Sequence, residues 1–144
     1  MPVTVQRGTG YSFLSTCATR TSSIDPACPA GEGGSVTRVN VFAGVCGCST
    51  VIQAEKNENR RVVLAIESDC EAVRELGAAL CDVDPFCEIT FRGEGPLTLR
   101  LAQHILPHAA CPVPAGIIKA VEVAGGLALP ADATIRVSID DPEK

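Results

Sequence analysis

The sequence predicts an α+β fold, a two-layer sandwich in which a mixed sheet of about five strands carries about three helices on one face. Short segments alternate between apolar and polar residues, as half-buried strands do, and other segments repeat their apolar residues at helical spacing. A hydrophobic content of 46% over 144 residues is enough for one domain with its own core. Only 3% of the residues are aromatic, so an aliphatic core is expected.

The N-terminal part differs from the rest of the chain. Residues 1–35 are rich in Ser, Thr, Gly and Pro, lack apolar periodicity and end in a glycine-rich stretch. Such a composition buries too little apolar surface to offset its ordering entropy, which predicts a disordered tail. A mis-annotated start, with translation beginning at Val36, is the alternative. Residues 36–144 are predicted to form a single α+β domain.

Three strands are predicted at the start of this domain. Residues 38–41 alternate, a glycine loop covers residues 44–49, and a second strand lies around residues 50–55. Turn residues at 57–59 lead into a third strand over residues 61–67. Because the connections are short, the three strands should form an antiparallel meander. The first and third strands then end at the same edge of the sheet.

Helices and two further strands are predicted beyond residue 68. Ser68 and Asp69 indicate a helix start, and a stripe of Val73, Leu76 and Leu80 follows at helical spacing. The next predicted elements are a fourth strand over residues 87–92, a helix carrying Leu97, Leu101 and Ile105, a helix from Pro112, and a last strand over residues 134–139. Alternation in most strands leaves one sheet face for solvent or for another subunit, so a homo-oligomer or a protein partner is expected there.

Charge and hydropathy exclude several classes of function. The net charge is -5, and Lys and Arg are scattered, which argues against binding to nucleic acid or to an anionic membrane surface. No apolar run approaches the roughly 18–20 residues of a membrane-spanning helix. No secretory signal is recognisable at the N-terminus, so a cytoplasmic location is expected.

Three of the eight cysteines are predicted to meet at one rim of the sheet. Cys46 and Cys48 lie in the loop after the first strand, and Cys70 follows the third strand. Since those strands end at the same edge, the fold itself should bring these thiols together. In a cytosolic domain with a core, such cysteines favour metal binding or thiol chemistry over a disulfide framework.

Cys111 lies in the most informative stretch, residues 108–119 (HAACPVPAGIIK), where it directly precedes a proline-led helix start. The unpaired amides and the positive dipole end of a helix favour a thiolate at such a position. A metal ion, an iron–sulfur cluster and a sulfur-transfer reaction all use a thiolate, and the sequence leaves these three open. Whether Cys111 reaches the rim of Cys46 and Cys70 is open as well.

The first functional hypothesis is a binding module in which Cys46, Cys70 and Cys111, with Cys48 as a further ligand, hold a metal ion or iron–sulfur cluster. The alternative is a sulfur carrier that bears a persulfide on Cys111. A structural subunit with buried thiols is the third interpretation. The sequence contains none of the familiar hydrolase or nucleotide-binding motifs, and whether the protein is an enzyme is left open.

Two resemblances bear on these hypotheses. The motifs GVCG at 44–47, SDC at 68–70 and ACPVP at 110–114 resemble those of a small uncharacterised family of anaerobic bacteria and archaea, over residues 36–139. This resemblance implies no activity, only that Cys46, Cys70 and Cys111 belong to the family's pattern. The CPVP motif, the helix after it and the last predicted strand resemble the TusA-type sulfur carriers, in which the CPxP cysteine carries a persulfide. That likeness departs before the cysteine, where a short strand is expected and a helix with His108 is predicted.

Overall fold

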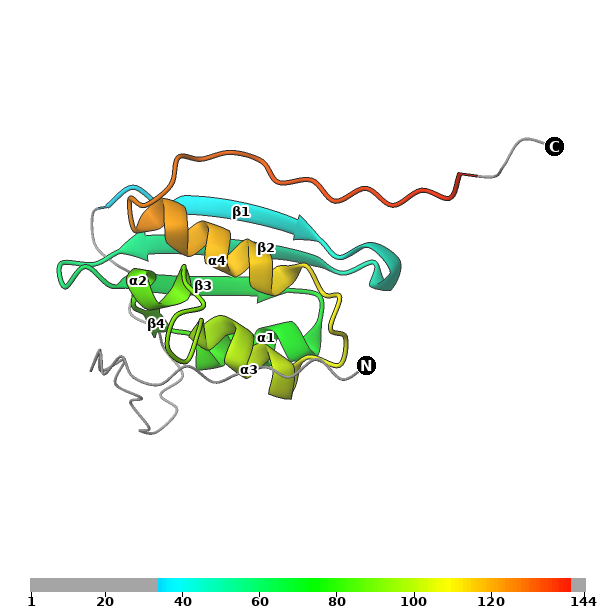
Figure 1. Ribbon diagram of the computed structural model, residues 1–144, viewed down its shortest axis with the longest axis horizontal. Coiled ribbons are helices and arrows are strands. Elements are labelled where there is room, and N and C mark those ends of the chain that lie inside the picture. The colour runs from blue at the N-terminus through cyan, green and yellow to red at the C-terminus, as the bar shows by residue number, and fades with distance from the viewer. Residues whose placement is uncertain (1–33, 141–144) are drawn as a thin grey trace, which may run out of the picture.

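The computed structural model describes residues 34–140 and shows an α+β sandwich (Figure 1). The predicted tail or mis-annotated start at residues 1–35 therefore lies almost entirely outside the described residues. The described elements are β1 (Thr37–Phe42), the 3-10 turn η1 (Gly44–Cys46), β2 (Ser49–Lys56), β3 (Val62–Ser68), α1 (Glu71–Ala79), β4 (Asp82–Val83), α2 (Pro85–Glu88), α3 (Leu97–Ile105) and α4 (Val113–Ala124).

The first three strands form the predicted antiparallel meander. Val39 pairs with Ile52, and Ile52 pairs with Ile66, so these apolar residues share one face of the sheet. Both ends of this register are fixed by polar groups. Asn57 Oδ1 accepts a hydrogen bond from the Arg61 backbone amide at one end, and the Thr50 and Ser68 hydroxyls lie 2.7 Å apart at the other.

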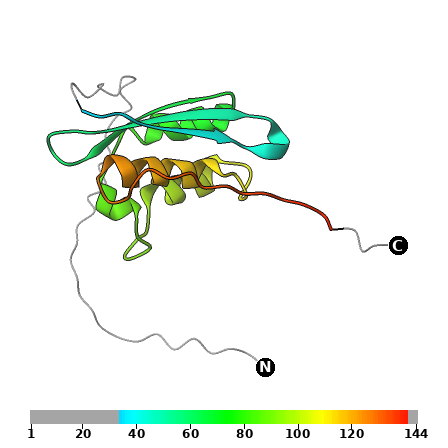
Figure 2. The ribbon, with the colours of Figure 1, turned by 90° about the horizontal axis from the view of Figure 1, so that it is seen from above.

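Helices cover one face of this sheet (Figure 2). A glycine in α4 and another in α1 allow these helices to lie close to the sheet. A Cβ at Gly116 of α4 would lie 2.6 Å from Val41 Cγ2, and one at Gly77 of α1 would lie 2.9 Å from Ile66 Cβ. The buried core between the layers is aliphatic, as predicted, and consists of Ile52, Ala54, Val62, Leu64, Val73, Leu76, Leu80, Val83, Ala102, Val113, Ile117, Ala120 and Val121.

The predicted number of strands and the predicted mixed pairing of the sheet were wrong in detail. The described residues form a four-stranded sheet in the order β1-β2-β3-β4 with antiparallel pairing throughout, together with four α-helices rather than three. The fourth strand is the two-residue β4, and the predicted strand over residues 87–92 does not form.

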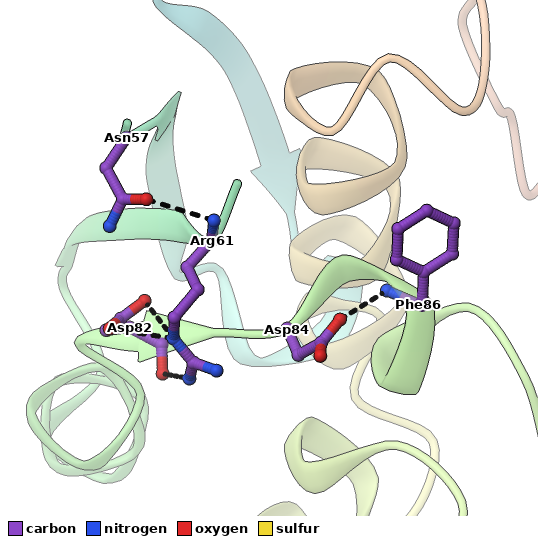
Figure 3. Close-up of polar contacts among 5 residues, drawn as sticks. All are labelled: Asn57, Arg61, Asp82, Asp84 and Phe86. Atoms are coloured by element: carbon purple, nitrogen blue, oxygen red, sulfur yellow. Dashed lines mark hydrogen bonds and ion pairs between the residues drawn. The ribbon is translucent and has the colours of Figure 1, made fainter. Parts of the chain in front are cut away.

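The turn into α2 explains why that strand is absent (Figure 3). Arg61 Nε lies 2.9 Å from Asp82 Oδ1, which ties β4 to the start of β3. Asp84 then accepts a hydrogen bond from the Phe86 amide at 2.9 Å, and Pro85 occupies the first helical turn. An N-cap carboxylate followed by proline is a helix start, and this local chemistry overrides the alternating pattern of residues 87–92.

The last predicted strand, over residues 134–139, is also absent from the described structure. The chain after α4 turns at Gly126, whose φ is +77°, and continues without regular secondary structure to residue 140. Ile135, Val137 and Ile139 are exposed there. Within the described part of one chain, this alternating segment therefore pairs with no strand, and its apolar side is not buried against a core.

Candidate thiol site

The sheet register brings Cys48 and Cys70 opposite each other just beyond the paired strands. Thr50 pairs with Ser68 in the register of β2 and β3. The next pair is held by two hydrogen bonds: the Ser49 amide donates to Asp69 Oδ2 at 3.0 Å, and the Asp69 amide donates to the Ser49 carbonyl at 3.1 Å. Cys48 and Cys70 come one residue beyond this pair, and Cys70 is near enough to contribute to the raised pKa of Cys48.

Cys46 approaches the same rim on the exposed turn η1. Gly44 and Gly47 flank this turn with φ values of +75° and +68°, a backbone region that favours glycine. The Ala43 amide donates to the Cys48 carbonyl at 3.0 Å, which closes the loop at its base. Val45, at the tip, is fully exposed. Cys46 is therefore exposed on a loop that is tied only where it joins the sheet.

The electrostatics of Cys48 show that this thiol shares its surroundings with two other cysteines. Partial burial raises the pKa of Cys48, and hydrogen bonding with Cys46 raises it further. The negative charges of Cys46, Cys70 and Asp69 add to the increase in the pKa, because each disfavours a second anion nearby. Cys46, Cys48 and Cys70 thus form a coupled group of thiols.

Cys70 is the N-cap residue of α1, one position later than the predicted Ser68 or Asp69. Its side chain makes no capping hydrogen bond, and its backbone amide donates to Ser68 Oγ at 3.2 Å. Arg74, one turn into the helix, donates from Nη1 to the Ser68 carbonyl at 2.8 Å. Cys70 is therefore placed at a helix N-terminus, and the Arg74 guanidinium of the same helix is fixed against the end of β3.

Cys111 lies at the same end of the sheet but enters from the helix layer. Pro112 is the N-cap of α4, so Cys111 precedes the cap, and its amide donates to the His108 carbonyl at 3.3 Å. Gly116 packs against Val41 near the end of β1, and Cys111 lies five residues closer to the rim. In Figures 1 and 2 η1 and the starts of α1 and α4 lie at this one end.

Cys70 and Cys111 are half-buried and pack against the same hydrophobic core, whereas Cys46 is exposed. Within residues 34–140, no three His, Cys, Asp or Glu side chains stand close enough together to hold a metal ion as they are placed. The donor set suits a soft or borderline metal, because thiolates are the ligands that such ions select. A shared centre would therefore need a further movement of at least one of these residues.

Cys81 and Cys87 are distinct from this group. Both are disulfide-bonded, whereas Cys46, Cys48, Cys70 and Cys111 are free. Cys81 follows α1 at the end opposite Cys70, and Cys87 belongs to α2, not to the strand predicted for it. Since disulfide bonds are uncommon in the reducing cytoplasm, the cytoplasmic location stays a prediction.

The sequence interpretation missed Asp69 as a part of the site. Asp69 was assigned to a helix cap, but its carboxylate instead holds the start of β2 and acts on Cys48. The signal was the SDC motif at 68–70: an Asp between a strand end and a helix N-cap can reach the neighbouring strand once the register is known.

No helix in the described part of the chain is long and apolar enough to cross a membrane. Comparison with curated proteins and with solved structures finds no match. The TusA-type likeness therefore has no support from these comparisons, and the C-terminal strand that it implies does not form within residues 34–140. A family match does cover most of the described residues, including the cysteines at 46, 70 and 111. The chain belongs to the family of unknown function DUF6951, which it matches over residues 37–137.

Proposed function

We propose that Cys46, Cys70 and Cys111, with Cys48 as a further ligand, bind a metal ion or an iron–sulfur cluster. The observation that supports this proposal is the meeting of Cys48 and Cys70 just beyond the hydrogen bonds between Ser49 and Asp69, with Cys46 on the adjoining turn. The raised pKa of Cys48, caused first by burial and then by Cys46 and Cys70, agrees with this arrangement. A thiol whose ionisation is hindered by neighbouring negative groups gains from a bound cation, because the cation offsets the repulsion and stabilises the thiolate.

Closure of η1 is the movement that the proposal requires. The glycines at both ends of this turn have open space around their Cα atoms, and Val45 at its tip contacts little else. Cys46 can therefore be carried toward Cys70 without disturbing the core. Cys70 and Cys111 start from positions fixed by α1 and α4, so they supply the rigid part of the centre.

The experiment is elemental analysis of the full chain purified under anaerobic conditions. We expect iron with acid-labile sulfide, or zinc, near one centre per chain. Cys70→Ser should lose most of this content, because a rigidly placed ligand is removed. Cys87→Ser is the control and should retain the metal even though it breaks a disulfide bond, since Cys87 lies outside the coupled thiols. A folded, metal-free wild-type protein that takes up neither iron nor zinc on reconstitution would reject the proposal.

A sulfur carrier that uses Cys111 is the second candidate. It is favoured by one observation: Cys111 is not among the groups that act on Cys48, so its thiol need not belong to the coupled group. In this function the Cys111 thiolate attacks the outer sulfur of a persulfide on a cysteine desulfurase. A new S–S bond forms on Cys111, and the donor leaves as a thiolate.

Alkylation separates the two candidates. A metal-bound Cys111 should resist iodoacetamide until a chelator is added, whereas a carrier cysteine should react without one. Incubation with a cysteine desulfurase and cysteine should add the mass of one sulfur to Cys111 if it is a carrier. No added mass, together with chelator-dependent alkylation, would leave the metal centre as the function.

A further inference from the structure

The C-terminal arm, defined here as residues 134–139, exposes three large apolar side chains in a row of alternating residues. Ile135, Val137 and Ile139 are 79%, 91% and 90% exposed, and they alternate with Thr134, Arg136 and Ser138. Three β-branched residues on one side of an extended chain form the apolar face of a strand. Such a row of large apolar side chains is a surface for association.

The chain also carries an unpaired strand edge. In the sheet order β1-β2-β3-β4, β1 pairs only with β2, and no strand within residues 34–140 lies along its outer side. A free edge presents backbone donors and acceptors that pair readily with an added strand. This edge adjoins the helix layer, because Val39 and Val41 of β1 face α4 at Gly116.

The arm and the edge match each other in length and pattern. Both have six residues and alternate along their length: the arm places Ile135, Val137 and Ile139 on one side, and β1 places Thr37, Val39 and Val41 on its inner side. Pro130 and Pro142 bracket the arm and leave its amides uninterrupted between them. Since proline cannot donate in a central strand, the pairing segment is confined to the residues that carry the alternation.

We propose that the arm adds as a strand to the outer edge of β1 in a second copy of this chain. Figure 1 shows the arm running in the same direction as its own β1 and ending beyond the sheet, and Figure 2 shows it at the level of the helices. Pairing with its own β1 would thus be parallel, in a sheet whose other pairings are all antiparallel.

A second copy allows antiparallel pairing, which is slightly more stable per residue. Exchange between two copies is also reciprocal. Each arm pairs with β1 of the other copy, and a single two-fold axis relates the two pairings. The exchanged strand would extend the sheet to five strands, with Ile135, Val137 and Ile139 on the side that Val39 and Val41 already share.

The test combines solution mass with hydrogen exchange on the full chain, after the free thiols have been blocked with iodoacetamide, so that they cannot link two copies while the disulfide bonds of Cys81 and Cys87 stay intact. We expect a dimer by light scattering, with protected amides over residues 134–139 and at β1. Val137→Lys should give a monomer and at least a tenfold loss of protection in the arm. Ser138→Lys places the same charge on the polar side of the arm and should remain a dimer.

Several results would overturn the proposal. A monomer with a protected arm would mean that the arm pairs with its own β1, and a monomer with an unprotected arm would mean that it is free. A dimer that persists in Val137→Lys would place the interface elsewhere. On dilution of the wild-type protein below the dimer's dissociation constant, arm protection should fall in step with the mass; protection that survives dissociation would also count against exchange.

Discussion

At the scale of single residues, Cys48 offers a direct test of the coupled thiols. Because its pKa is raised by partial burial and by Cys46, Cys70 and Asp69, its alkylation rate should reach half of its maximum at a higher pH than that of an ordinary cysteine. Cys46→Ser removes the ionisable thiol whose charge contributes to the raised pKa of Cys48, so the midpoint should move to lower pH. Mass spectrometry of alkylated peptides across a pH series measures this for each cysteine separately.

The sign of the linked effect on stability follows from the same shift. A thiol whose pKa is higher in the folded chain than in the unfolded chain favours the folded state while it is protonated. This contribution is fully present below the unfolded pKa and is lost as pH rises through the folded pKa. Cys46→Ser should therefore reduce the fall in stability on the alkaline side. An unchanged midpoint in Cys46→Ser would show that Cys46 does not contribute to the raised pKa of Cys48.

At the scale of the elements, Glu88 joins α2 to α3. This carboxylate is buried, and it accepts the Leu97 amide at 2.8 Å and the Thr98 amide at 3.1 Å at the start of α3. Glu88→Ala should cost about 2–4 kcal/mol in the free energy of unfolding, because two amides and a cavity are left in the interior. Urea denaturation measures the loss. Glu58→Ala, at an exposed position, is the control and should change stability by less than about 0.5 kcal/mol.

The contact between α4 and β1 gives a second prediction at this scale. Gly116→Ala would place a Cβ 2.6 Å from Val41 Cγ2, so it should destabilise the fold by about 1–3 kcal/mol despite a gain in helix propensity of about 1 kcal/mol. In a Val41→Ala background the added methyl has room, and the same change should become neutral or stabilising. A cost that is equal in both backgrounds would show that the two residues are not coupled.

The elements that the sequence predicted well are those in which local pattern and packing agree. The meander β1-β2-β3, the helix carrying Leu97 and Leu101, and α4 all form within two residues of their expected bounds. Residues 87–92 were mistaken for a strand because the apolar alternation there is real, but Asp84 and Pro85 start a helix. Their capping chemistry is a stronger local signal than a period of two over six residues.

The sequence predicts which cysteines lie near each other only as far as it predicts the order and direction of the strands. Short connections placed Cys46, Cys48 and Cys70 at one rim, since β1 and β3 must end together in a meander. The register that sets Cys48 opposite Cys70 depends on the hydrogen bonds between Ser49 and Asp69, which no spacing in the sequence specifies. The place of Cys111 follows from how α4 packs on β1, and this in turn follows from the close approach at Gly116.

At the scale of the whole molecule, metal binding at the rim should stabilise the entire domain. The proposed ligands come from η1, the start of α1 and the approach to α4, so the bound state exists only when the sheet and both helices are assembled. A ligand present at one hundred times its dissociation constant adds about 2.7 kcal/mol to the stability of the folded state. For a domain of about 100 residues this corresponds to a rise in Tm of roughly 10–20 °C, at about 4–8 °C per kcal/mol.

Calorimetry of the reconstituted protein and of the same sample after chelation should show this difference in Tm, and Cys70→Ser should show little of it. Cys87→Ser should unfold at a different temperature from wild type, because a disulfide-bonded cysteine is lost, yet its Tm should respond to the metal as the wild type's does. The change in Tm on adding the metal, rather than the Tm itself, therefore reports on metal binding at the rim. An equal response in Cys70→Ser and in wild type would place the metal away from this rim, because an ion held there loses a ligand when Cys70 is replaced.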